Sequence, residues 1–169
     1  LRVNARNAII ASLLLIGLYI SIRFDGYYAI GSLFALLHDV FITLGIFVFM
    51  NVEISISIIA ALLTIVGYSL NDTIVIYDRI RENMSLNPYR DKKKIFNTSL
   101  NQTLKRTLVT SLTTLIVVLV LYIYGGDVLQ PFSIALIIGI ILGTYSSIFI
   151  ASPVTLFLEE KYNIEEEDD

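Results

Sequence analysis

The sequence predicts an all-α membrane protein, namely a bundle of five membrane-spanning helices. Its 169 residues are 56% hydrophobic and only 16% charged, and a soluble domain of this length would carry more charge. Several apolar runs approach or exceed the roughly 20 residues that a helix needs to cross a bilayer. Mostly short polar segments separate these runs, which leaves very little of the chain for a soluble domain.

The apolar runs place the five helices in chain order. They cover approximately residues 7–22, 28–50, 54–77, 106–124 and 131–158, so that the bundle occupies residues 1–158. Pro131 suits the first turn of the last helix, where its missing N–H costs no hydrogen bond. Pro153 predicts a kink in that helix or its frayed end.

Two polar segments are expected outside the membrane. Segment 78–105 is basic, and the apolar rhythm within residues 92–105 predicts a short interfacial helix there. Residues 159–169 form an acidic tail, whose last five residues are all acids and are expected to be solvated and disordered.

The basic residues predict the orientation. With five crossings, Arg23, segment 78–106 and Lys161 fall on one side and carry ten of the twelve Lys and Arg residues. Such a side is normally cytoplasmic, which puts the C-terminus in the cytoplasm and the N-terminus outside. An outside start without a signal peptide predicts an earlier crossing upstream of Leu1.

Composition also argues against several function classes. The chain has no cysteine and one histidine, His38, so a thiolate or histidine metal site is not expected. No nucleophile, phosphate loop or ligand cluster stands out in the sequence. We therefore expect no enzyme, metal, cofactor or nucleic-acid partner.

One carboxylate lies inside the apolar part of the third helix. Asp72 follows Ser69 and Asn71 and precedes Asp78 by six residues, which places it ~9 Å deeper along the helix axis. A carboxylate at that depth costs roughly 2.5–3.5 kcal/mol on insertion scales. Such a residue is normally paired or hydrated, and Asp72 is a candidate functional residue.

Arg106, which opens the fourth helix, is the simplest partner for Asp72. A nearby cation favours the charged acid, and desolvation without that cation favours the neutral acid. A partner that moves would therefore make Asp72 a proton relay, and a fixed partner would make a static ion pair. Alternatively, Arg106 extends to the membrane surface beside Lys105.

Other polar residues lie at membrane depth. Thr110 and Thr113 fall within about 40° of Arg106 on a helical wheel, which predicts one polar stripe. Either His38 and Asp39 form a second titrating site, or His38 bonds a backbone carbonyl. Because adjacent helical side chains point about 100° apart, these two are not expected to pair with each other.

The last helix carries small residues at every fourth position. They are Ala135, Gly139, Gly143, Ser147 and Ala151. Such a stripe lets two helix backbones approach closely, and it predicts a packing seam within the chain or against another subunit.

The central motifs resemble the SecF protein-export family, within the resistance-nodulation-division superfamily. The matching blocks are LHDV (37–40) with ITLG (42–45), AALLTIVGYSLNDT (60–73), DRIREN (78–83), RT (106–107) and TSLTT (110–114). The resemblance covers residues 7–158, and the GYSLNDT and DRIREN blocks are its most specific parts.

This resemblance implies a function and partners. Members associate with SecD and the SecYEG translocon in the bacterial inner membrane, and they use the proton gradient to pull unfolded secreted proteins across. Accessory translocon subunits and membrane lipid are further partners. The family's proton-coupling residues correspond to Asp72 and Arg106. Members have six helices with a periplasmic domain after the first, so this sequence would lack that helix and that domain.

Two alternatives to the export function remain at this point. The chain could be half of a small-molecule or lipid exporter of the same superfamily, or a structural assembly scaffold. The GYSLNDT and DRIREN blocks favour protein export over the first alternative. A scaffold would tolerate Asp72→Asn, whereas either transporter would not.

Overall fold

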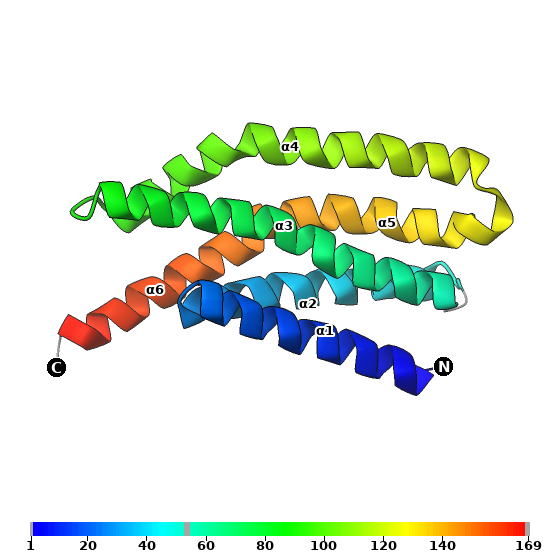
Figure 1. Ribbon diagram of the computed structural model, residues 1–169, viewed down its shortest axis with the longest axis horizontal. Coiled ribbons are helices and arrows are strands. Elements are labelled where there is room, and N and C mark those ends of the chain that lie inside the picture. The colour runs from blue at the N-terminus through cyan, green and yellow to red at the C-terminus, as the bar shows by residue number, and fades with distance from the viewer. Residues whose placement is uncertain (1, 53–54, 168–169) are drawn as a thin grey trace.

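The computed structural model describes residues 2–52 and 55–167, and the side chains of residues 6–52 and 55–161 (Figure 1). The elements are α1 (Arg2–Arg23), α2 (Gly26–Phe49), α3 (Ile56–Leu86), α4 (Lys92–Tyr124), α5 (Gly126–Ser146), the π-helical turn η1 (Ser147–Ala151) and α6 (Ser152–Glu167). No strand occurs within the described ranges. Five spans are long and apolar enough to cross a membrane, the last of them running from α5 into α6. The predicted all-α, five-helix bundle is confirmed.

Segment 78–105 is more helical than expected. Helix α3 continues to Leu86, and α4 already begins at Lys92. Residues 92–105 are therefore not a separate interfacial helix but the first half of α4. The Asp91 side chain accepts a hydrogen bond from the Lys93 amide at 3.0 Å, which caps α4 at this early start. Only residues 87–91 connect the two helices.

The prediction for Pro131 differs from the structure, whereas the kink predicted at Pro153 is present. Helix α5 begins at Gly126, so Pro131 lies inside the helix and not in its first turn. Gly126 has φ +70°, a value that glycine adopts without strain, and this allows the tight turn from α4. Pro153 follows the π-helical turn η1, and α6 leaves the direction of α5 there (Figure 1). The expected kink is present, because proline cannot supply the N–H that the regular helix needs.

The acidic tail is also helical in the part that is described. Helix α6 extends to Glu167, so residues 159–167 continue the helix of the last span. Residues 168–169 lie outside the described residues.

The bundle has two distinct ends (Figure 1). At one end lie the α1–α2 turn, residues 87–91 and the C-terminal end of α6. Ion pairs hold this end together, from Arg23 to Asp78 at 3.2 Å and from Lys92 to Glu159 at 3.3 Å. We call it the basic end. At the opposite end lie the N-terminal part of α1, the α2–α3 connection and the α4–α5 turn.

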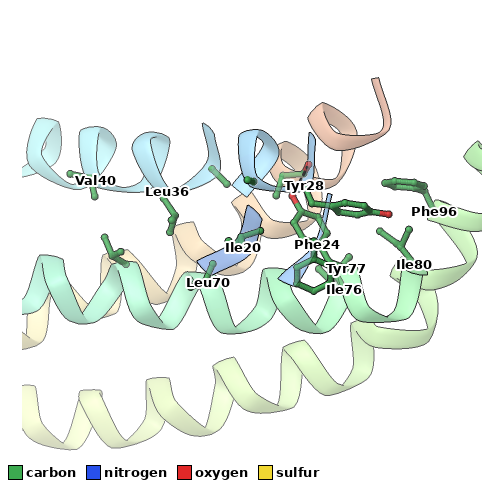
Figure 2. Packing of buried hydrophobic residues seen from close by; sticks show 14 residues of the cluster. Ile20, Phe24, Tyr28, Leu36, Val40, Leu70, Ile76, Tyr77, Ile80 and Phe96 are labelled. Atoms are coloured by element: carbon green, nitrogen blue, oxygen red, sulfur yellow. Dashed lines mark hydrogen bonds between the residues drawn. The ribbon is translucent and has the colours of Figure 1, made fainter. Parts of the chain in front are cut away.

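Aromatic residues fill the core near the basic end (Figure 2). Tyr28 and Tyr77 are 2% and 0% exposed, and their rings meet edge to face at 4.8 Å. Phe24 closes the cluster from the end of α1. The Tyr77 hydroxyl bonds the Thr155 hydroxyl at 2.7 Å, so this cluster joins α2 and α3 to the kinked last span.

The small-residue stripe of the last span packs inside the chain. A Cβ added to Gly139 would collide with Ile65 of α3, and one added to Gly143 would lie 2.9 Å from the Cβ of Ser69. Ala135, Ser147 and Ala151 are fully buried. The backbones of α3 and α5 therefore approach closely along this seam, which brings polar side chains of both helices together.

Candidate functional site

Asp72 lies in the middle of the bundle and has little hydrogen bonding. It is 3% exposed, and its Oδ2 accepts one long hydrogen bond of 3.5 Å from the Ser111 hydroxyl of α4. Ser111 in turn shares a hydrogen bond of 2.6 Å with Thr144 of α5. A carboxylate with so few donors is held weakly in its charged form.

Arg106 does not form the direct ion pair that was expected with Asp72. The guanidinium is exposed, and no ion pair of Arg106 occurs within the described residues. It is nevertheless near enough to act on the Asp72 carboxylate through its charge. The structure therefore brings the two residues into electrostatic range without contact.

Arg106 lines an open cavity of about 560 Å³ between α3 and α4, toward the basic end. The other lining residues are Asn71, Ile74, Val75, Asp78, Arg79, Glu82, Gln102 and Thr103. Arg79 bridges the wall by bonds of 2.6 Å to both Glu82 and Gln102. Asn71 is thus exposed to this cavity while its neighbour Asp72 points into the bundle. Because the lining is polar and charged, water can fill the cavity and reach the level of Asp72.

The polar face of α4 that meets the bundle is not the predicted stripe. The hydroxyls of Thr110 and Thr113 donate hydrogen bonds to backbone carbonyls of their own helix, and both side chains stay at least partly exposed. The buried polar residues of α4 are Ser99, Thr103, Thr107 and Ser111. These recur every four residues, a spacing that places side chains on one helix face. That spacing was available in the sequence, but the sequence does not say which face meets α3 and α5.

A second buried carboxylate, Asp39, lies within hydrogen-bond distance of three side chains. It is 0% exposed, and its Oδ2 accepts bonds of 2.7 Å from Ser69 of α3 and from Ser146 of α5. Its Oδ1 lies 3.1 Å from Nδ1 of His38. The expectation that His38 and Asp39 do not pair is therefore wrong. The two serines occupy one carboxylate oxygen, which leaves the other turned toward the imidazole.

Sequence reasoning missed Ser111, Thr144 and Ser146 as parts of this site. Each is a small hydroxyl residue in an apolar helix, and only tertiary packing brings Ser111 and Ser146 to a carboxylate and Thr144 to Ser111. No group of three or more metal-ligating acids and histidines gathers within the described part of the chain. The arrangement consists of two buried carboxylates, Asp39 and Asp72, that lie among hydroxyl side chains and form no ion pair with a Lys or Arg within the described residues.

Residues 1–161 match the family model for the protein export membrane protein SecD/SecF, C-terminal. The chain belongs to the SecD/SecF family. The protein translocase subunit SecF of Rhodothermus marinus is 51% identical over 167 residues, which cover 95% of this chain and 54% of that protein. The SecF subunit of Vibrio alginolyticus is 52% identical over 151 residues, 89% of this chain and 48% of that protein. The chain thus spans about half the length of these curated relatives.

Solved structures of SecDF share the fold. A crystal structure of SecDF in the super-membrane-facing form superimposes with a TM-score of 0.92 at 46% identity, over 99% of this chain and 23% of that one. SecDF from Thermus thermophilus, described as a translocon-associated membrane protein, gives a TM-score of 0.90 at 47% identity, over 94% of this chain and 22% of that one. The predicted family is confirmed.

Proposed function

We propose that this chain is the proton-coupled membrane part of a SecF-type subunit of the protein-export machinery. With a SecD-type partner and the SecYEG translocon, it would use the proton gradient across the bacterial inner membrane to move unfolded secreted proteins. Accessory translocon subunits and membrane lipid would be further partners. The family membership and the SecF and SecDF names of its relatives support protein export over a small-molecule or lipid exporter.

The main support for the proposal is the environment of the Asp72 carboxylate. This carboxylate is 3% exposed and receives only one long hydrogen bond. Arg106 stands near it on the wall of an open, polar cavity and forms no fixed ion pair there. An acid with a nearby but unattached cation can gain or lose a proton when the helices move a short distance. A static structural ion pair would instead show direct contact.

The coupling step follows from charge and burial. When α3 and α4 bring Arg106 close, the charged form of Asp72 is favoured and a proton leaves through the polar cavity. When the helices separate the two groups, burial favours the neutral acid and a proton is taken up from the other side. Proton flow is thereby tied to relative movement of these helices, which a domain outside the membrane can use.

The distribution of basic residues supports one orientation for this cycle. The basic end would face the cytoplasm and the opposite end the periplasm. The cavity lined by Arg106 lies on the basic-end side of Asp72, so protons would leave into the cytoplasm. Protons would then move from the periplasm to the cytoplasm, which is down the proton gradient of a respiring bacterium.

A complete SecD–SecF-type complex carrying Asp72→Asn tests the proposal. The amide mimics the neutral acid permanently, so the complex should assemble but lose gradient-driven export, while ATP-driven export through SecYEG continues. Arg106→Ala should have the same effect, because it leaves Asp72 neutral. Export of a secreted protein into inverted membrane vesicles, with and without a proton gradient, measures both steps.

Asp127→Asn is the matched control. Asp127 is an exposed acid in the first turn of α5, remote from the cavity, and its amide variant should export normally. Gradient-driven export at the wild-type level by the Asp72→Asn complex would show that the carboxylate is structural. The chain would then be a scaffold.

A further inference from the structure

Asp39 is a buried carboxylate that the proposed coupling step does not use. Three elements converge on it, since Ser69, Ser146 and His38 bond its two oxygens from α3, α5 and α2. No Lys or Arg pairs with it within the described residues. A buried carboxylate without a cation is costly in a membrane. This cost points to a function for Asp39.

The position of Asp39 places it in line with Asp72. Its partner Ser69 precedes Asp72 by three residues on α3, which is about 4.5 Å along the helix axis. Helix α3 runs from the opposite end to the basic end (Figure 1). The Asp39–Ser69 pair therefore lies about one turn nearer the opposite end than Asp72, on the side away from the Arg106 cavity.

We propose that Asp39 is a second proton-binding residue, which lies on the opposite-end side of Asp72 and passes protons to it. This inference rests on the proposed function, because it extends the route of the same proton. In the transfer, neutral Asp39 loses one proton and charged Asp72 gains one, so net charge in the bundle is unchanged.

Hydroxyl groups supply a route between the two carboxylates. Ser69 and Ser146 bond Asp39, while the Thr144–Ser111 pair bonds Asp72. Ser69, which bonds Asp39, precedes Asp72 by three residues, a spacing that places both side chains on the same side of α3. A hydroxyl can accept one proton as it donates another, so these groups can relay protons without becoming charged for long.

Two further buried hydroxyls lie one helical turn from this route. The Oγ1 atoms of Thr43 and Thr107 have no hydrogen-bond partner in the part of the chain that the structure describes. Thr43 follows Asp39 by four residues on α2, and Thr107 precedes Ser111 by four on α4. Buried polar groups are normally satisfied by protein or by ordered water, so these two provide sites where water can join the relay.

His38 connects Asp39 to the surface of the bundle. Its side chain is 29% exposed, whereas that of Asp39 is 0% exposed, so the imidazole lies between the carboxylate and the surface of the bundle. The ring lies near Tyr145 of α5, with ring centroids 6.4 Å apart. Apart from His38 and Tyr145, the groups that face Asp39 from α3 and α5 are the neutral hydroxyls of Ser69 and Ser146.

Asp39→Asn in the complete SecD–SecF-type complex, reconstituted in phospholipid vesicles, tests this inference. The amide keeps an oxygen acceptor for the serine hydroxyls but cannot titrate. A pH-sensitive dye inside the vesicles measures gradient-driven proton entry. We expect entry to fall by about 100-fold, the lower part of the range for removing a positioned proton-transfer group. Asp127→Asn serves again as the control and should leave entry unchanged.

The outcomes separate this inference from the proposed function. If Asp72→Asn abolishes proton entry and Asp39→Asn does not, Asp39 only holds the helices together and the inference is overturned. If neither variant changes proton entry, the proposed function fails as well. Should Asp39→Asn fail to assemble, Asp39→Glu keeps a titrating acid at an altered position. The inference then requires a shifted pH dependence of proton entry, and an unchanged pH profile overturns it.

Discussion

At the scale of single residues, the environment gives chemically similar side chains different roles. Asp39 lies 2.7–3.1 Å from three side-chain partners, whereas Asp72 has one partner at 3.5 Å among the described residues, so Asp39 is held more firmly than Asp72. The buried tyrosines divide in the same way. Tyr77 bonds Thr155 at 2.7 Å and the Ala151 carbonyl at 3.4 Å. The buried Tyr68 hydroxyl has no partner within the described residues.

Tyr77→Phe should therefore lower the stability of the assembled complex. It removes a hydroxyl that ties α3 to the kink of the last span, and a net hydrogen bond is worth about 0.5–1.5 kcal/mol. Tyr68→Phe is the matched control, since it removes a hydroxyl that bonds no described residue and should be neutral or slightly stabilising. The thermal midpoint of each purified complex measures the difference. Equal midpoints for the two variants would mean that the Tyr77–Thr155 bond contributes nothing.

At the scale of elements, the close approach of α5 to α3 shapes the site. The seam of small residues lets Ser69 and Ser146 reach the same oxygen of Asp39 from two helices. The π-helical turn η1 begins directly after Ser146. Extra residues in a helical turn often occur at functional sites, and this turn lets α6 change direction without disturbing the contact of α5 with Asp39.

Gly143→Leu should disturb folding or assembly. A Cβ alone would already lie 2.9 Å from the Cβ of Ser69, and overpacking a well-filled interior typically costs about 1–3 kcal/mol. Gly45→Leu is the matched control, because a Cβ at Gly45 meets nothing within 4 Å. The yield of complex with the SecD-type partner and its thermal midpoint provide the measurement. Normal assembly and export by Gly143→Leu would show that the seam tolerates separation of the two helices.

At the scale of the whole molecule, the basic residues gather at one end of the bundle. Ion pairs from Arg23 to Asp78 and from Lys92 to Glu159 join four elements there. The cavity lined by Arg106 lies between Asp72 and the same end. Asp39 lies nearer the opposite end, so the two carboxylates are ordered along the direction in which protons would cross.

Labelling of single cysteines tests the orientation of the molecule. Position 93 should react only from the cytoplasm, and positions 51 and 127 only from the periplasm, because basic residues are retained on the cytoplasmic side. An impermeant thiol reagent, applied to intact cells and to inverted vesicles, distinguishes the two sides. The absence of natural cysteines means that each label reports one position. Reaction at position 93 from outside the cell would reverse the assignment of both ends.

The sequence by itself determined the fold class, the five spans, the family and Asp72 as a carboxylate at depth. Apolar length and charge distribution act locally along the chain, so they can be read without knowing which helices touch. Only the tertiary structure decided that Asp39 joins His38, Ser69 and Ser146, and that Thr107 and Ser111 face inward instead of Thr110 and Thr113. Which face of a helix is buried depends on the packing of its neighbours, and in a membrane both faces are apolar enough to hide that choice.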